Sequence, residues 1–375
     1  MPLLHLTTLA LALPKNPRLH PALQLHTPCN GLSTTTHGRI FLVYQHVDGT
    51  APNPQIVEYD TTTHISTPYP NAAWNNYTVN STLDPAQHFL SANAQRIGPD
   101  GKLYVVDTGQ PGGSGATQAG SGPVDLPDGV KVVQIDVSTD SVTRIYPFGN
   151  ATNSQSHLDD IRFHISTGFA YLTDAGSPAI IILNLETGET RRVLEGVPST
   201  NAFIHVSAEG HFLVSSSGPS YTYADQLEVS PDGEHLYYQA SSGSMFRIPC
   251  AALDDAFYNS SMAQNSVLST YVEPFTHTPS TGGTAIDADG NIYCSNTDTQ
   301  SVLRIYPNGT MTTLVQDPRL LWVDAMWVDS QGLLWMPCPQ LNRGVSYNNG
   351  TSKIVKPLNI FTLDIGVGPP ANDHP

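Results

Sequence analysis

The sequence predicts an all-β protein, specifically a six-bladed β-propeller with a ligand site at one mouth of its central channel. Two observations carry this prediction: a short motif that recurs six times, and a small residue, usually polar, at a fixed distance before each copy. A repeat at this scale is typical of propellers, in which each copy forms one blade. The 30 Pro and 30 Gly residues agree with a fold that contains many turns.

The repeated motif is a turn that ends in Gly and continues into a β-rich run. In several copies the turn is Pro-Asp-Gly or Ala-Asp-Gly, where Asp bonds its own backbone and Gly takes a positive φ. These Asp residues are therefore predicted to build turns rather than to bind metal. The copies are HGRIFLVY at 37–44, DGKLYVVD at 100–107, TGFAYLTD at 167–174, DGEHLYYQ at 232–239, DGNIYCSN at 289–296 and QGLLWMPC at 331–338.

The blades are expected to follow one another without a linker that would divide the chain. A Gly- and Ser-rich stretch at 107–129 is predicted to be a loop of the second blade. Residues 250–263 are the best candidate for a short helix, and strands within 353–366 are expected to close the sixth blade. The predicted domains are an N-terminal segment at 1–28, the propeller at 29–366 and a C-terminal tail at 367–375.

The residues before the motif are predicted to form a ring. The innermost strand of each propeller blade lines the channel, so a position repeated in every blade returns around one axis. Carboxylates gathered there are costly unless they are solvated, hydrogen-bonded or bound to a cation. Three interpretations stay open: the ring satisfies backbone groups between blades, binds or acts on a ligand, or holds a structural cation. Its members stand eight residues before each Gly: Asn30, Asn93, Asp160, Asp225, Gly282 and Asp324.

Composition limits the partners and the compartment. The net charge of -16 argues against binding to nucleic acid or to an anionic membrane. The apolar run at 3–13 is too short to span a bilayer but has the character of a signal peptide. With the N-x-[ST] sequons, it predicts entry into the secretory pathway or secretion, and hence one or two disulfides among the four cysteines. The sequons lie at Asn76, Asn80, Asn150, Asn259, Asn308 and Asn349.

Several stretches resemble the major royal jelly protein and yellow family. The likeness extends from about residue 30 to 365 and implies a six-bladed β-propeller. It does not imply one activity, because the family includes nutrient proteins, ligand binders and enzymes. The stretches are NAQRIGPDGKLYVVDTG at 93–109, HLDDIRFHISTGFAYLTDAG with AIIILNLETGETRRVLEG within 157–196, DQLEVSPDGEHLYYQ at 225–239 and LLWVDAMWVDSQGLLWMPCPQLNR at 320–343.

Two further stretches are similar to fungal members of this family: LHTPCNGLSTTTHGRIFLVY at 25–44, and WNNYTVN followed by HFLSANAQRIGPDG within 74–101. Some fungal members belong to the biosynthesis of tropolone sesquiterpenoids. The resemblance therefore implies a hetero-Diels–Alderase, which joins a polyketide-derived quinone methide to a humulene-type sesquiterpene and forms a dihydropyran. Such a cyclase needs no cofactor, and its partners are the polyketide and terpene substrates. The resemblance supplies no matched catalytic residues.

The candidate roles come from the residues themselves. An Asp or His of the ring is expected to protonate a benzylic-type hydroxyl so that water leaves, while Arg or His bonds the carbonyl oxygen of the diene. The predicted catalytic residues are Asp160, Asp324, His157 and Arg343. The predicted substrate-binding residues are Asn30, His88, Phe89, Asn93, Asp225 and Trp322.

Two alternatives from other classes remain. A metal-dependent, lactonase-like hydrolase would use Asn93, Asp160, Asp225 and Asp324 as oxygen ligands for Ca²⁺ at the channel mouth, although the ring contains no Glu. A non-enzymatic propeller would bind a small amphiphile or amine in the channel. The chain contains no GxSxG, HExxH, P-loop or GxGxxG motif that would favour another chemistry.

Overall fold

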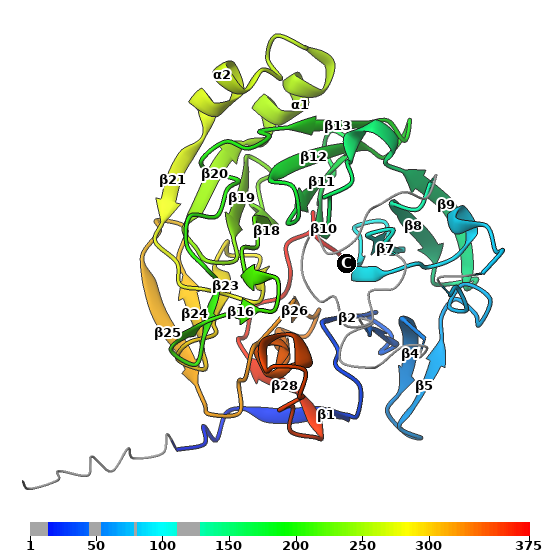
Figure 1. Ribbon diagram of the computed structural model, residues 1–375, viewed down its shortest axis with the longest axis vertical. Helices are drawn as coiled ribbons and strands as arrows, with labels where there is room; N and C mark the ends of the chain where they lie inside the picture. The colour runs from blue at the N-terminus through cyan, green and yellow to red at the C-terminus, as the bar shows by residue number, and fades with distance from the viewer. Residues whose placement is uncertain (1–13, 45–53, 79–80, 111–127) are drawn as a thin grey trace, which may run out of the picture.

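The computed structural model describes residues 14–44, 54–78, 81–110 and 128–375. These residues form six four-stranded antiparallel sheets that surround a central channel (Figure 1). The predicted six-bladed β-propeller is therefore confirmed. In five sheets the strands follow the chain order from the channel to the rim. In the sixth the order from the channel is β26 (Trp327–Val328), β27 (Leu333–Pro337), β28 (Leu358–Asp364) and β1 (His20–Leu25). Every copy of the motif therefore supplies the second strand of its blade.

The first three blades contain residues 31–193. The first consists of β2 (Gly31–Thr34), β3 (Ile40–Val43), β4 (Ile56–Asp60) and β5 (Ile65–Pro68). The second consists of β6 (Ala92–Ile97), β7 (Leu103–Asp107), β8 (Lys131–Asp136) and β9 (Ser141–Pro147). The third consists of β10 (Leu158–His164), β11 (Phe169–Asp174), β12 (Ala179–Asn184) and β13 (Thr190–Val193). Most of the predicted loop at 107–129 lies outside the described residues.

The fourth blade carries the predicted helix, and the fifth and sixth follow it. The fourth consists of β18 (Ala224–Val229), β19 (His235–Ala240), β20 (Met245–Pro249) and β21 (Glu273–Thr276), with α1 (Cys250–Tyr258) and α2 (Asn265–Leu268) before its last strand. The fifth consists of β22 (Thr284–Ile286), β23 (Ile292–Asn296), β24 (Ser301–Ile305) and β25 (Met311–Gln316). The sixth contains β26 (Trp327–Val328), β27 (Leu333–Pro337) and β28 (Leu358–Asp364). Short 3₁₀ turns are η1 (Pro85–Gln87), η2 (Gly149–Ala151), η3 (Ser269–Tyr271), η4 (Leu341–Arg343) and η5 (Val345–Tyr347).

The ring is closed by a strand from the N-terminal part of the chain. Strand β1 (His20–Leu25) pairs with β28 and completes the sixth sheet at the rim. The predicted boundary at residue 29 was therefore wrong, since the propeller already includes β1. This edge strand was missed because it has no copy of the motif, and because only Leu23 and Leu25 of its side chains are buried.

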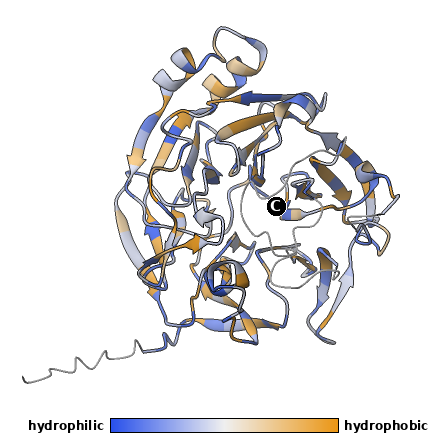
Figure 2. Cartoon of the chain, viewed as in Figure 1, coloured by the Kyte–Doolittle hydropathy of each residue, from blue (hydrophilic) through white to orange (hydrophobic). Residues whose placement is uncertain are grey.

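Hydrophobic side chains pack between neighbouring blades, where Figure 2 shows orange residues along the strands. The four cysteines are free, and each lies in a different hydrophobic cluster. Because the clusters belong to different parts of the ring, the predicted disulfides were wrong.

The described residues contain no helix long and apolar enough to cross a membrane. Entry into the secretory pathway stays a prediction, because residues 3–13 and the sequon at Asn80 lie outside the described residues. The asparagines of the other sequons are exposed and accessible to glycosylation, which a shift in gel mobility after deglycosylation would detect. They are Asn76, Asn150, Asn259, Asn308 and Asn349.

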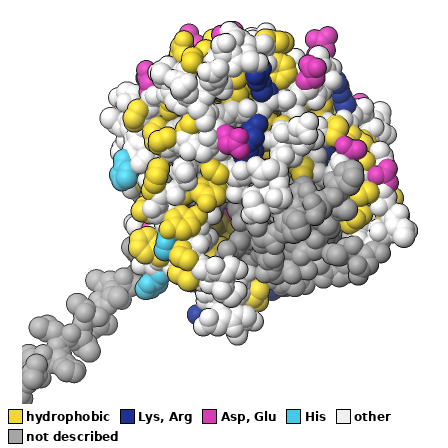
Figure 3. All heavy atoms as spheres, turned by 45° about the horizontal axis from the view of Figure 1, so that its top comes forward, with side chains coloured by type: hydrophobic (Ala, Val, Ile, Leu, Met, Phe, Trp, Pro, Cys, Tyr) yellow, Lys and Arg dark blue, Asp and Glu magenta, His cyan; other side chains and the backbone are white. Residues whose placement is uncertain are grey.

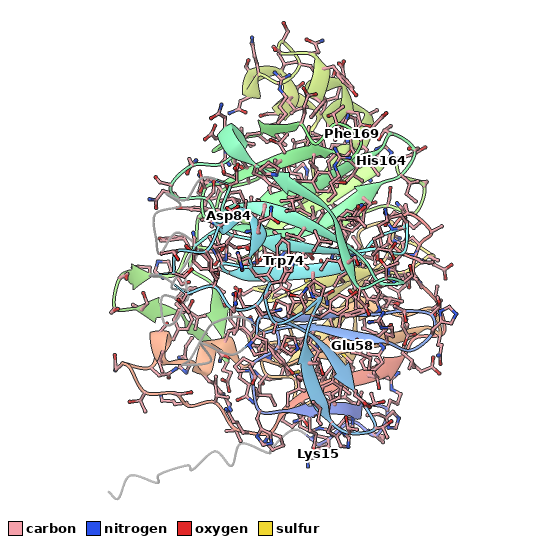
Figure 4. All side chains as sticks on the ribbon, turned by 90° about the vertical axis from the view of Figure 1, so that its right-hand side faces the viewer. Lys15, Glu58, Trp74, Asp84, His164 and Phe169 are labelled. Carbon is pink, nitrogen blue, oxygen red and sulfur yellow. The ribbon has the colours of Figure 1, made fainter. Side chains whose placement is uncertain are left out.

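Two segments project from one face of the disc. They are the paired hairpins β14–β15 (Ser207–Ala208, His211–Phe212) and β16–β17 (Val214–Ser215, Gly218–Pro219), and the segment that contains η4 and η5. The side view in Figure 4 shows both on the side away from His164, the last residue of the inner strand β10. They therefore project from the face on which the inner strands begin, which we call the mouth face.

The C-terminal segment lies in the channel (Figure 1), beside the ends of the inner strands β6 and β26 rather than their beginnings. Arg96 of β6 donates to both carboxylate oxygens of Asp373. His374 stacks on the Trp327 ring with 3.6 Å between centroids and bonds the backbone oxygen of Val328. The predicted tail at 367–375 is thus ordered, and its end fills the channel floor.

We expect Asp373→Asn to destabilise the protein by about 1–3 kcal/mol at pH 7, because Arg96 would lose its buried anionic partner. Burial alone raises the pKa of Asp373, but Arg96 and His374 together hold it well below its ordinary value. The stabilisation is therefore present above the ordinary carboxyl pKa of about 4 and is lost as the pH falls below it. Thermal unfolding of both proteins between pH 7 and pH 2.5 measures this; a difference that stays constant with pH would contradict the ion pair.

Candidate active site at the channel mouth

The side chains of the ring project from β-bulges in the inner strands. In β6, β10 and β18 the register shifts at the strand start, so that extra residues face the second strand. The extra residues are Asn93 in β6, Asp159 or Asp160 in β10 and Asp225 in β18. Such β-bulges release a side chain from the ladder and re-aim it, often beside active sites. The repeated polar residue thus marks a bulge at the mouth.

The structure brings three predicted acids together with one that was not predicted. Asp160, Asp225 and Asp324 act electrostatically on one another and on Asp159. Asn93 joins them because its Nδ2 donates to Oδ1 of Asp159 over 2.6 Å. Asn30 lies beside Asp324, since the following residues, Gly31 and Ala325, form a parallel bridge.

Three of these carboxyl groups have no cationic partner within the described residues, namely Asp159, Asp225 and Asp324. Burial raises the pKa of Asp324 to about 8, against hydrogen bonds from the Ala325 amide and the Trp322 indole. Burial likewise raises the pKa of Asp225 to about 6 and that of Asp159 well above its ordinary value. At neutral pH the mouth therefore holds protonated carboxyl groups, which have protons to donate.

Asp160 is different because it is part of an ion-pair network deeper in the channel. Arg162 Nη1 lies 2.6 Å from Asp160 Oδ2, and the same guanidinium binds both carboxylate oxygens of Glu228 at 2.8 Å. Thr284 donates to Glu228 from the next blade over 2.7 Å. This network links three inner strands and separates the mouth from the channel floor.

The one ring member without a polar side chain, Gly282, is explained by Trp322. A Cβ at Gly282 would lie 2.5 Å from the Val323 oxygen and 2.9 Å from Trp322 Nε1. Trp322 itself adopts a φ of 53°, a conformation that costs energy for a non-Gly residue. The indole fills the sixth position of the ring and donates to Asp324 Oδ2 over 2.9 Å. Trp322 is therefore part of the mouth, and its role in binding substrate stays a prediction.

Other predicted residues lie away from the acids. His157 bonds Gln110 at 3.2 Å, and burial lowers its pKa to about 4 against Asp174, so the imidazole is neutral. Arg343 forms an ion pair of 2.7 Å with Glu209 on the hairpin segment of the mouth face. Its charge is thus already compensated. Neither contacts the acids in the described part of the chain.

His88 and Phe89 were predicted to bind substrate, and the structure places them elsewhere. His88 bonds the backbone oxygen of Asp84 at 2.8 Å and stands near the Trp74 ring. Phe89 is fully buried in the core of the first blade, with its ring 5.1 Å from that of Trp74. Its predicted contact with substrate is therefore corrected to core packing, which is the usual role of an apolar residue before a strand.

Sequence reasoning missed Asp159, Arg162 and Glu228. A signal was present: β6, β10 and β18 each carry a charged residue two or three positions after the ring residue, in strands otherwise buried. Lone charges are almost never fully buried unless they are paired. Charged residues in three successive inner strands thus indicate a paired network in the channel.

The sequence matches the family described as Major royal jelly protein over residues 91–361, which is more than half of the chain. The chain belongs to the major royal jelly protein family. No curated protein matches it closely enough to count as a relative.

Solved structures similar to this major royal jelly protein family member are also propellers. A luciferin-regenerating enzyme is 13% identical with a TM-score of 0.54, over 95% of this chain and 98% of the other. The calcium-binding protein regucalcin from Agrobacterium tumefaciens is 11% identical with a TM-score of 0.52, over 92% of each chain. A streptogramin B lyase is 12% identical with a TM-score of 0.50, over 92% and 96%. At these identities the likeness shows the fold alone.

The described residues at the mouth of this family member form no recognisable metal site. Within the described residues no three His, Cys, Asp or Glu side chains are grouped so that they could hold one. Two of the predicted oxygen ligands already have other partners: Arg162 binds Asp160, while Ser241 and Gln226 both donate to Oδ2 of Asp225. We therefore derive no step through a metal.

Proposed function

We propose that this protein is a fungal hetero-Diels–Alderase of secondary metabolism, which joins a tropolone or polyketide quinone methide to a humulene-type sesquiterpene. The observation that carries the proposal is the group of buried carboxyls at the mouth that lack cationic partners, because at neutral pH Asp324 keeps its proton while Asp225 does not. Forming the diene from an alcohol precursor needs such a donor, and the cycloaddition needs no cofactor.

The first step is a dehydration in which one carboxyl group donates a proton and another accepts one. Protonated Asp324 donates its proton to a benzylic-type hydroxyl, the C–O bond breaks and water leaves. The adjacent ring hydroxyl gives up its proton to a carboxylate of the mouth, and the quinone methide is neutral. Two carboxyl groups in opposite protonation states are needed, and Asp324 and Asp225, whose pKa values are raised to about 8 and about 6, supply them at neutral pH.

The second step depends on holding two apolar molecules together. Orientation of two reactants can contribute about 7–11 kcal/mol to a barrier. The projecting segment of the mouth face carries exposed apolar side chains: Phe203, Ile204, Phe212, Val214 and Tyr221. Beneath the hairpins, Val206, Ala208 and Leu213 pack against Trp322, whose indole bonds Asp324. An apolar surface thus continues toward the acids, as a terpene substrate requires.

The rest of the surface supports a small neutral substrate. Only 13% of the residues are charged, and apolar and uncharged side chains dominate the view in Figure 3. An anionic substrate would find few complementary side chains, because the chain has only 16 Lys and Arg residues against 32 Asp and Glu. The mouth itself offers carboxyl groups and amides, which hydrogen-bond to hydroxyl and carbonyl groups.

The test is to incubate the purified protein with the alcohol precursor of the diene and a humulene-type alkene. We expect one stereoisomer of the dihydropyran adduct, formed faster than without protein. A mixture identical to the protein-free control would reject the cyclase. Saturable binding of the alkene without any adduct would instead assign the protein as a binding module.

A further inference from the structure

We propose that Asp159 and Asp225 form a pair that shares one proton, and that Asp225, the ionised member, is the base that accepts the ring-hydroxyl proton. This inference rests on the proposed function for the reaction, but the pair itself is a property of the protein alone.

The pair follows from the geometry of two neighbouring blades. Asp159 lies in the bulge of β10 and Asp225 in the bulge of β18, and these strands are adjacent around the channel. Their carboxyl groups lie within hydrogen-bonding reach of each other. Two carboxylates are both acceptors, so a hydrogen bond between them requires a proton on one.

The other hydrogen bonds assign the proton. Oδ2 of Asp225 accepts from the Ser241 hydroxyl and from the Gln226 amide. Asp159 accepts from Asn93 alone among the described side chains. Donors stabilise the ionised form of a carboxyl group. Asp225 is therefore the carboxylate, and Asp159 holds the proton.

The remaining charged groups that face the pair do not neutralise it. Asp160 is bound to Arg162, whose guanidinium is also bound to Glu228. Asp324 is bound by the Trp322 indole. The burial and negative neighbours that raise the pKa of Asp159 thus have no cation to oppose them within the described residues.

One unpartnered acceptor beside the pair and one beside Asp324 point to a ligand that donates hydrogen bonds. The amide of Gln226 donates to Asp225, while its Oε1 is buried and has no partner. Oδ1 of Asn30, next to Asp324, is likewise buried without a partner. Both residues are more than nine-tenths buried. Buried polar atoms are normally satisfied, so a hydroxyl-bearing substrate completes this site.

The chemistry is then complete. Asp324 gives a proton to the leaving hydroxyl, and Asp225 takes one from the ring hydroxyl. Afterwards Asp324 is ionised and the pair holds two protons. One proton must return from Asp225 to Asp324, directly or through the released water, before the next turnover. The enzyme consumes no external acid or base.

The first test needs no substrate. Infrared spectra of the protein with ¹³C-labelled Asp should show protonated carboxyl bands at pH 7, one of which is lost in Asp159→Asn. In Asp225→Asn the Asp159 band should vanish at a lower pH than in the unsubstituted protein, because the negative partner is gone. A band that titrates identically with and without Asp225 would overturn the shared proton. The exposed turn variant Asp289→Asn is the control and should leave the bands unchanged.

The second test distinguishes a role of Asp225 as the base from a purely structural role. We expect Asp225→Asn to lower kcat for the alcohol precursor about 100-fold, while adduct formation from a chemically generated quinone methide changes less than threefold. Equal loss with both substrates, or full activity with the alcohol, would overturn the assignment. Absence of adduct with the unsubstituted protein rejects the proposed function itself, and the infrared result still stands.

Discussion

Asp324→Asn is expected to lower kcat for the alcohol precursor by about 100-fold or more. Burial raises the pKa of Asp324 to about 8, so its carboxyl holds a proton at neutral pH and can donate it. The amide of Asn keeps the shape and can still accept the hydrogen bond from Trp322, but its nitrogen cannot accept from the Ala325 amide, and it has no acidic proton. Steady-state rates between pH 6 and pH 9 measure the effect. The rate of the unsubstituted protein should fall as the pH rises through about 8, and the variant should lack this decline.

The same substitution, which lowers activity, is expected to raise the free energy of unfolding at high pH. The pKa of Asp324 is raised in the folded protein from 3.8 to about 8, so the folded state binds the proton more tightly than the unfolded chain. Stability from this group is therefore full at low pH and is lost as the pH rises through about 8. Asp324→Asn should gain stability relative to the unsubstituted protein above pH 8 and little near pH 4. A variant that is less stable at pH 9 than at pH 5, relative to the parent, would show that Asp324 is an ordinary ionised residue.

Arg162→Ala is expected to reduce the free energy of unfolding by about 3–5 kcal/mol, because it leaves Asp160 and Glu228 buried without their cation. Arg162 is only 2% exposed and links β10 to β18 through Glu228. Urea or thermal unfolding at pH 7 measures the loss. The control is Arg247→Ala, which removes an exposed ion pair with Glu273 and should cost less than about 1 kcal/mol.

A second variant shows whether the loss comes from the uncompensated charge. Glu228→Gln introduced into Arg162→Ala should restore part of the stability, since the amide needs no cation. Additive losses in the double variant would mean that Arg162 acts by packing. An Arg162→Ala protein as stable as the Arg247→Ala control would contradict the buried network altogether.

The fold was predictable because each blade repeats the same turn and strand. The structure of the two ends of the chain was not predictable in this way. Strand β1 has no copy of the motif, and its sequence shows no regular pattern. Its position in the sheet is determined by backbone pairing with β28. The C-terminal residues read as a polar tail, and only Arg96 and Trp327, both distant in sequence, make burial of Asp373 and His374 favourable.

The site was predictable as far as the repeat extends. Asp160, Asp225 and Asp324 occupy equivalent positions, and the structure gathers them at one mouth. Asp159 has no counterpart in the other blades, because it owes its position to the bulge in β10. Phe89 and His88 were included for their proximity in sequence to Asn93, but Phe89 packs in the core and His88 bonds the backbone of Asp84.

The most direct test of the mouth as the reaction site is a crystal structure of the protein with the dihydropyran product bound. We expect the product to lie on the mouth face with its oxygen atoms within hydrogen-bond distance of Asp324 or Asp225, and its terpene portion against the apolar side chains of the projecting hairpins. A product bound on the outer rim, or at the channel floor beside Asp373, would contradict it.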